Sequence, residues 1–189
     1  MADPDAPRLH PTDLDEWSRW LAANHNSSSG VWLVFWRKES GETPLDYDGA
    51  VREALCWGWI DGHTRGIDDS RRGMWFTRRG RTSVWAASNK ARVADLIAEG
   101  RMRPPGQAVI DDAVARGLWN ILDDAEALIE SAELASALDA DPVARHNWDG
   151  FPPSVRKFAL TQIAMAKRPE TKSKRITSIV EKAARGERP

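Results

Sequence analysis

The 189-residue sequence predicts an α+β fold, and the prediction rests on a change of periodicity along the chain. The first half contains short runs of β-branched and aromatic residues with period-two alternation, which is typical of strands. From residue 83 onward only the spacing of amphipathic helices remains. We therefore expect a small antiparallel-rich sheet packed by helices, followed by a C-terminal helical subdomain. The expected parts are a flexible N-terminal arm over 1–11, an α+β core over 12–122 and a helical module over 123–189.

Three strands are expected in the core. Residues 31–38 (VWLVFWRK) are apolar on both sides, so this strand should be central in its sheet. Residues 58–67 alternate with period two, and residues 73–79 are their natural hairpin partner across the DDSRRG turn. Before this hairpin, residues 47–55 show helical periodicity that places Tyr47 on the apolar face.

The clearest helix of the sequence is expected to begin at Ser83. Thr82 or Ser83 is its predicted cap, and Gly100 is its predicted stop. Its predicted core face consists of Trp85, Val93, Leu96 and Ile97. Asn89 lies on the same face, and because a buried amide needs partners, it should tether the helix to the sheet or line a pocket.

Composition narrows the class of protein. The single cysteine, Cys56, excludes an intramolecular disulfide and a cysteine-based zinc cluster. No apolar run approaches the roughly 20 residues that cross a bilayer. The N-terminus lacks the apolar segment of a signal peptide. We therefore expect a cytoplasmic protein without a membrane span.

The net charge of −1 hides four blocks of alternating sign. Residues 1–61 carry 5 basic and 11 acidic side chains, and residues 62–103 carry 10 and 4. Residues 104–149 carry 2 and 10, and residues 150–189 carry 10 and 3. Such blocks are either complementary surfaces of one body or patches for a ligand or partner.

A tryptophan-rich strand end, GWIDGH, carries the main candidate site. Read with period two, Trp59, Asp61, His63 and Arg65 share one face of the strand. One of two sets from the partner strand would lie beside them, either Trp75 with Arg79 or Phe76 with Arg78. Aromatic rings with polar and cationic edges are typical of a site for a planar or anionic group. The alternative is that the tryptophans belong to the core and that Asp61 pairs with an arginine for structural reasons.

A second candidate site is an anion site where the predicted helix begins. Arg78 and Arg79 precede Ser83, and a helix that starts there would leave the N–H groups of residues 84–86 without intrahelical partners. Arginines beside such a helix end can bind phosphate or carboxylate in a bidentate manner. Trp85 would supply an apolar wall. The alternative is that these arginines are ordinary solvated side chains of a hairpin.

Two other classes of function are alternatives to ligand binding, an enzyme and a nucleic-acid-binding module. Two residues apart on a strand, Asp61 and His63 have Cα atoms about 6.5–7 Å apart and no easy direct bond. No serine stands in a nucleophile elbow, and no third His or Glu lies at metal-ligand spacing, so we expect no catalytic residue, metal or cofactor. An enzyme that uses Asp61 and His63 stays as an alternative. So does a nucleic-acid-binding module that uses the two basic blocks.

Two long stretches of the sequence resemble a known family. VWLVFWRKESG, DYDGAVREALCWGWIDGHTRGIDD and FTRRGRTSVWAASNKARVADLIAEGRM are similar to sequences of the YdeI/OmpD-associated (bacteriocin-protection) family. The tail, PPSVRKFALTQIAMAKRPETKSKRITSIVEKAARG, resembles the C-terminal helical module of that family. Together they cover about residues 14–186.

The resemblance implies a non-enzymatic role in stress or in tolerance of antimicrobial peptides, with a porin as the family's associated partner. Joined to the residue patterns, it predicts a binding protein for a small anionic or aromatic ligand or for a segment of a partner protein. The predicted ligand-binding residues are Trp59, Asp61, His63, Arg65, Arg78, Arg79, Ser83, Trp85 and Asn89.

Overall fold

The computed structural model describes residues 3, 5–43 and 45–189 of the chain. Residues 1, 2 and 4 of the predicted N-terminal arm lie outside the described residues. None of the described helices is both long enough and apolar enough to cross a membrane. The predicted α+β fold with a C-terminal helical part is confirmed, since a mixed sheet with its helices precedes an all-helical stretch, and residues 101–189 contain no strand.

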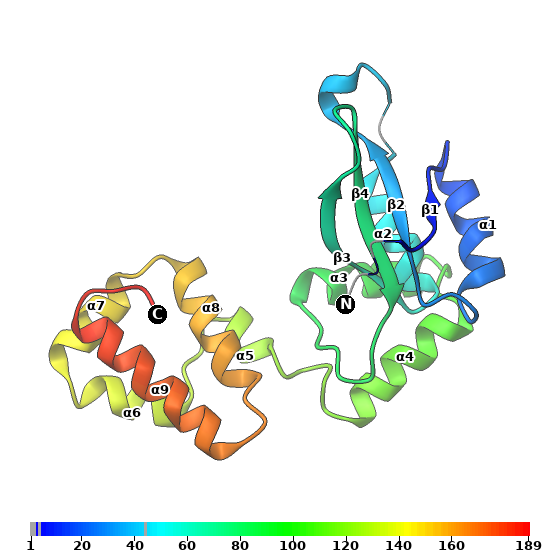
Figure 1. Cartoon of the computed structure of the whole chain (residues 1–189). Helices are drawn as coiled ribbons and strands as arrows, with labels where there is room; N and C mark the ends of the chain where they lie inside the picture. Colours follow the sequence, from blue (N-terminus) through cyan, green and yellow to red (C-terminus); the bar gives the residue numbers. More distant parts are fainter. Residues whose placement is uncertain (1–2, 4, 44) are drawn as a thin grey trace. The chain divides into compact units, whose positions relative to one another are not determined.

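The chain divides into two compact units, and each is described by itself (Figure 1). The α+β unit consists of Met1–Ser83 and Ser88–Arg116. The helical unit consists of Val84–Ala87 and Gly117–Pro189. The short segment Val84–Ala87 therefore belongs to the helical unit although the residues on both sides of it belong to the other.

The sheet of the α+β unit has the strand order β1-β2-β4-β3. Its strands are β1 (Arg8–Leu9), β2 (Gly30–Trp36), β3 (Trp59–Gly66) and β4 (Arg71–Arg78). β1 runs parallel to β2, and the other pairs are antiparallel. The three long strands begin and end within two residues of the predicted positions, and the expected central strand is β2, which is buried on both faces. The two-residue strand β1 was not predicted.

Helices α1 (Leu14–Asn24) and α2 (Tyr47–Cys56) cover one face of the sheet. The Trp17 ring of α1 meets Phe76 of β4 at 5.3 Å between centroids, and its indole N–H donates to the Ala50 carbonyl of α2 at 3.0 Å. The core of the unit therefore lies between these two helices and the face of the sheet that carries Phe76. A short 3₁₀ helix, Lys38–Ser40, follows β2.

Two further helices complete the unit, α3 (Ala87–Ala98) and α4 (Pro104–Ala115). α4 approaches α2 closely because Gly106 has no side chain. A Cβ at Gly106 would stand 2.4 Å from the Cys56 carbonyl oxygen. Ile97, which we expected in the core, is 49% exposed, because only the Val93 and Leu96 side of α3 is buried.

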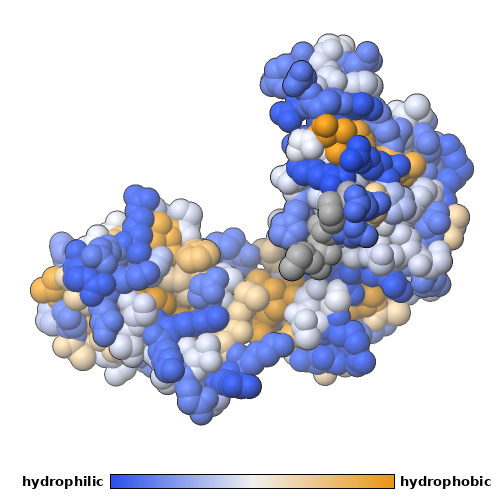
Figure 2. Space-filling view, viewed as in Figure 1, coloured by the Kyte–Doolittle hydropathy of each residue, from blue (hydrophilic) through white to orange (hydrophobic). Residues whose placement is uncertain are grey.

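The helical unit is built from five helices of the described chain. They are α5 (Asp123–Glu126), α6 (Ala132–Asp139), α7 (Pro142–Gly150), α8 (Pro153–Ala164) and α9 (Pro169–Ala184). Leu134, Leu138, Trp148, Leu160 and Ile176 are among its buried core residues. On its surface, Figure 2 shows apolar groups in separate patches among charged side chains.

Candidate functional site

A β-bulge divides the strand face that carries most of the predicted site. Asp61 pairs with Phe76 of β4, and the next regular pair joins Thr64 to Met74. β3 therefore has one residue more than β4 between these pairs, and the alternation of its side chains is interrupted. His63 lies inside the bulge and is exposed.

Beyond the bulge, the side chains of β3 change faces. Trp59 and Asp61 share the face of Phe76, whereas Arg65 pairs with Gly73 and lies over the Trp32 ring, on the opposite face. The expectation that Trp59, Asp61, His63 and Arg65 form one surface is therefore wrong. A period-two reading assumes an uninterrupted strand, so it misses the change of face that one extra residue causes.

Trp59 is a core residue. Its side chain is 0% exposed, its indole N–H donates to the His25 carbonyl at 3.2 Å, and its ring meets Trp20 edge-on at 5.6 Å. The core alternative is therefore the correct one for this residue, and Trp59 cannot offer its ring to a ligand. The polar end of the face, at Asp61, remains accessible because Asp61 is half-buried.

Asp61 accepts a short hydrogen bond from the Tyr47 hydroxyl, at 2.5 Å. Burial, together with the Asp61 carboxylate, raises the pKa of Tyr47 to about 12. Arg79 follows β4 and is only 9% exposed. Its burial lowers the pKa of the guanidinium to about 10, and the negative charge of Asp61 opposes part of that shift. The basic neighbour that we expected for Asp61 is thus Arg79, while Tyr47 was not foreseen.

Two more arginines lie around Tyr47. Arg92 of α3 donates to Asp48 through Nε at 2.8 Å and Nη2 at 2.7 Å, and through Nη1 to the Asn89 amide oxygen at 3.1 Å. The positive charges of Arg92 and Arg72 each pull the pKa of Tyr47 downward, against the larger upward shift. The half-buried Asn89 therefore holds Arg92, and Arg92 in turn connects α3 to Asp48 of α2.

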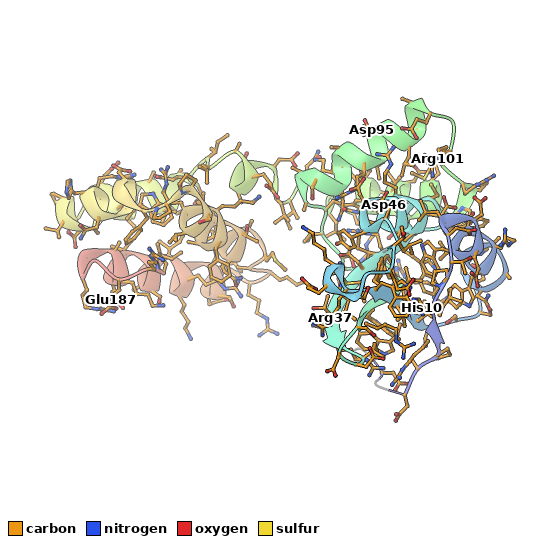
Figure 3. The ribbon with its side chains drawn as sticks, turned by 90° about the horizontal axis from the view of Figure 1, so that it is seen from above. His10, Arg37, Asp46, Asp95, Arg101 and Glu187 are labelled. Carbon is orange, nitrogen blue, oxygen red and sulfur yellow. The ribbon has the colours of Figure 1, made fainter. Side chains whose placement is uncertain are left out.

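These groups lie around Tyr47 and Asp61, and they come from the start of α2, from β3, from the two opposite ends of β4 and from α3. Asp46, which caps α2 and is labelled in Figure 3, marks the helix end at which they lie. We call them the Asp61 cluster, and its members are Tyr47, Asp48, Asp61, Arg72, Arg79, Asn89 and Arg92. Sequence reasoning missed Tyr47 because it assigned the ring to the apolar face of α2, although the side chain is 36% exposed. Its position next to the Asp46 cap was the signal that could have placed it at the helix end.

The helix start predicted at Ser83 is wrong, because α3 begins at Ala87, so residues 84–86 are not the first turn of a helix. Ser83 donates its N–H to Gly80 in a turn at 2.9 Å. The Ala87 N–H donates to the Glu126 carboxylate at 3.4 Å, so a side chain of the chain itself occupies this helix start. Trp85 is 2% exposed and packs against Trp119 at 4.8 Å, within the helical unit.

The remaining polar candidates also have structural neighbours. Arg78 is exposed and donates to the Asn26 carbonyl at 3.3 Å. Burial raises the pKa of the Cys56 thiol to about 11, which keeps it protonated at neutral pH. In the described part of the chain, no three His, Cys, Asp or Glu side chains are grouped so that they could hold a metal ion.

Comparison with protein families also divides the chain into two parts, with the boundary between residues 109 and 127. Residues 9–109, more than half of the chain, match the family described as a domain of unknown function (DUF8412). Residues 127–186 match the family described as bacteriocin-protection, YdeI or OmpD-associated. The chain belongs to the DUF8412 family, and its helical unit carries a YdeI/OmpD-associated domain. No curated protein and no solved structure matches the chain.

The candidate site and the domain whose family is described as bacteriocin-protection lie in different parts of the chain. Every member of the Asp61 cluster, and every residue of the predicted site, lies within the DUF8412 match. The resemblance to the YdeI/OmpD-associated family is confirmed for residues 127–186, and these contain none of the predicted site residues. A binding function at Asp61 therefore has to be argued from the geometry of the DUF8412 part.

Proposed function

We propose that the protein is a non-enzymatic binding protein, and that its DUF8412 part binds a small anionic ligand at the Asp61 cluster. The observation that supports this most is Arg79, whose guanidinium is only 9% exposed just after β4 and feels the negative charge of the half-buried Asp61. Removing such an ion from water costs several kcal/mol even after relaxation. Buried charges with shifted pKa values gather at functional sites more often than elsewhere.

The charges of the Asp61 cluster favour an anion. Arg72, Arg79 and Arg92 contribute three positive charges, against two negative charges from Asp48 and Asp61. A ligand carboxylate or phosphate would neutralise the excess, and guanidinium groups bind such anions with paired, charge-assisted hydrogen bonds.

The same cluster selects what else the ligand carries. Asp61 can accept a hydrogen bond from an amino or hydroxyl group placed near the anionic one. The Tyr47 ring, 6.4 Å from the Phe35 ring, offers an apolar surface beside these polar groups. A small metabolite with one anionic group and one donor group fits this combination better than a plain inorganic anion.

The chemistry of the cluster argues for binding rather than catalysis. With a pKa of about 12, the Tyr47 hydroxyl is neither a good proton donor nor a good acceptor at neutral pH. An enzyme that used His63 would require it as a base sheltered from solvent. His63 instead lies in the bulge and is exposed. The wider role that we propose, in stress or in tolerance of antimicrobial peptides, is supported by the bacteriocin-protection description of the family matched at residues 127–186.

Calorimetric titration of the full chain tests the binding proposal. The probes are phosphate, acetate, glutamate and adenosine monophosphate at millimolar concentrations. We expect one of the two probes with both an anionic and a donor group, glutamate or the nucleotide, to bind, and Arg92→Gln and Arg72→Gln to weaken that binding by about tenfold or more.

The matched control is Arg78→Gln, which removes an exposed guanidinium from the residue next to Arg79 and should leave the affinity unchanged. Circular dichroism establishes that each variant is folded. Absence of heat with all four probes, or equal losses in Arg92→Gln and Arg78→Gln, would refute binding at the Asp61 cluster.

A further inference from the structure

The helical unit has a groove between α8 and α9, which pack against each other (Figure 1). The volume of the groove is about 140 Å³. Pockets that enclose a whole small ligand typically measure about 300–1,000 Å³, so this groove has room only for one side chain of a longer molecule. It is lined by Phe158, Ala159 and Gln162 of α8 and by Arg175, Ser178 and Ile179 of α9, together with Pro189.

The α8 side of the groove is apolar and open to solvent. Phe158 is 57% exposed, whereas Ala159 and Ile179, which also line the groove, are buried. Met165, two turns further along the chain, is 45% exposed. Positions 158 and 165 are seven residues apart, so they lie on the same side of a helical segment. The exposed apolar surface therefore extends beyond the groove, and a partner longer than one side chain would cover it.

Arg175 supplies the charge of the groove. Its Nη1 donates to the Gln162 carbonyl in the last turn of α8, which holds the half-buried guanidinium in place. Its Nε and Nη2 have no hydrogen-bond partner within the described chain, and neither atom is buried. No Asp or Glu lines the groove, and none in the described chain pairs with Arg175. The guanidinium can therefore bind a carboxylate from another molecule with charge-assisted hydrogen bonds.

The charges around the groove have the same sign as Arg175. Residues 150–189 carry 10 basic and 3 acidic side chains. Lys167 and Arg168 lie exposed between α8 and α9, and Lys174 is exposed on α9. None of these three side chains has an ion pair with another residue of the described chain. An acidic partner would complement this surface.

We propose that the groove between α8 and α9 binds an acidic segment of a partner protein, which inserts one apolar side chain. The inserted side chain packs against Phe158 and Ile179, and a neighbouring carboxylate of the segment binds Arg175. A nucleic acid would match the charges, but it has no aliphatic side chain to fill the groove. The proposal is independent of the Asp61 cluster, because that cluster belongs to the α+β unit.

The test is fluorescence anisotropy of a labelled peptide of leucine and glutamate with the full chain. Two further peptides separate the contributions: one has alanine in place of leucine, and the other has lysine in place of glutamate. We expect saturable binding of the leucine–glutamate peptide. Binding should be about fivefold weaker or more with alanine, because the groove is then left unfilled, and absent with lysine, because the charges repel.

Variants of the chain locate the binding. Arg175→Gln should weaken it about tenfold, and Phe158→Ala about fivefold. Phe158→Ala is the safer variant for folding, since that side chain is exposed, whereas Arg175 also holds the end of α8. Lys174→Gln is the matched control, because it removes an exposed charge next to Arg175 that does not line the groove, and it should change the affinity less than about twofold. Circular dichroism establishes that each variant is folded.

Four results would overturn the proposal. Equal affinity for the leucine and alanine peptides would mean that no side chain enters the groove. Equal losses in Arg175→Gln and Lys174→Gln would mean diffuse attraction between charges. An unlabelled single-stranded oligonucleotide that displaces the labelled peptide more effectively than the unlabelled peptide does would favour nucleic acid as the partner. The fourth is the lack of saturable binding by any of the peptides.

Discussion

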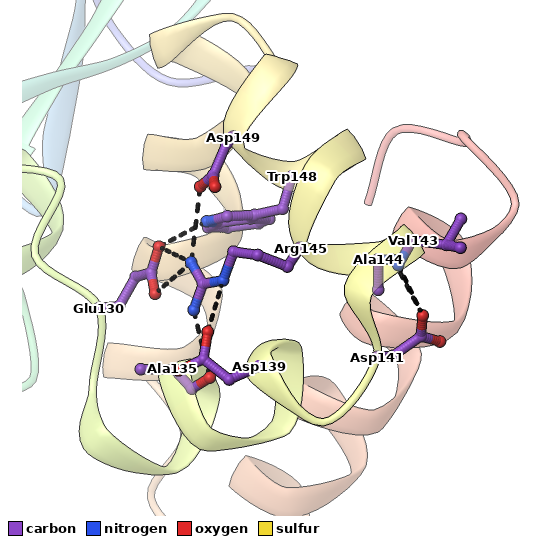
Figure 4. A network of polar contacts seen from close by, with 9 residues as sticks. All are labelled: Glu130, Ala135, Asp139, Asp141, Val143, Ala144, Arg145, Trp148 and Asp149. Atoms are coloured by element: carbon purple, nitrogen blue, oxygen red, sulfur yellow. Dashed lines mark hydrogen bonds and ion pairs between the residues drawn. The ribbon is translucent and has the colours of Figure 1, made fainter.

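Arg145→Ala should destabilise the helical unit more than the loss of any exposed ion pair, because Arg145 of α7 contacts both α6 and the segment before it (Figure 4). From α7 its guanidinium donates to both Glu130 oxygens at 3.0 Å, to Asp139 at 2.8 Å and to the Ala135 carbonyl at 3.2 Å. Glu130 also accepts the Trp148 indole N–H at 2.7 Å. The variant would leave Glu130 with one donor in a partly buried place.

The magnitude follows from the burial of this pair. The side chains of Arg145 and Glu130 are 24% and 19% exposed, whereas Asp139 is 67% exposed and adds little. Removing one partner of a fully buried pair costs about 3–5 kcal/mol. For a pair with this residual exposure we expect a loss of about 2–3 kcal/mol, which corresponds to roughly 10–20 °C in the midpoint of a small domain.

Scanning calorimetry of the full chain measures this loss. Arg185→Ala is the matched control, because its pair with Glu187 is more than half exposed on both sides and should contribute nothing measurable. Glu130→Gln should cost less than Arg145→Ala, since the amide oxygen still accepts from Trp148. If Arg145→Ala and Arg185→Ala unfold at the same midpoint, the network does not stabilise the unit and the reasoning is refuted.

Two further results are expected. Gly106→Ala should lower the free energy of unfolding by about 1–3 kcal/mol, because its Cβ would meet a backbone oxygen of α2 at 2.4 Å. Gly150→Ala is the control and should be neutral or slightly stabilising, because a Cβ there has nothing within 4 Å. Urea unfolding compares the two variants, and equal midpoints would contradict the close approach of α4 to α2. Tyr47 is the single tyrosine, so tyrosinate absorbance reports it alone, with a midpoint at about pH 12 that Asp61→Asn moves toward the ordinary 10.0. Because the folded pKa is raised, this contribution to stability is complete below the ordinary value and disappears as the pH rises through about 12; a wild-type midpoint at 10.0 would exclude the hydrogen bond.

The strands were predictable because their signal is local. Residues 31–38 are β-branched and aromatic on both sides, and only a central strand buries both of its faces, as β2 does. The hairpin of β3 and β4 follows from alternation on both sides of a short turn. These features depend on neighbours in the sequence, so tertiary contacts had little to change.

The candidate site was predicted less well because it depends on contacts between distant segments. Asp61 was found, but its partner Tyr47 comes from another element, and nothing in a strand pattern identifies such a partner. The prediction that a helix begins at Ser83 was wrong for a similar reason. Val84–Ala87 packs into the helical unit, so the chain cannot begin α3 until Ala87, although Thr82 and Ser83 are good caps.

Ion pairs within each unit account for part of the alternating charge blocks. Within each unit, ion pairs join acids of an acidic block to bases of a neighbouring basic block, as the alternative of complementary surfaces predicts. They include Arg101 with Glu53, Lys157 with Glu126, and Lys172 with Glu133. Arg92 belongs to this group through Asp48, yet it also borders Asp61. An anion at the Asp61 cluster must therefore compete with Asp48, so Asp48→Asn should strengthen ligand binding while it weakens the contact of α2 with α3.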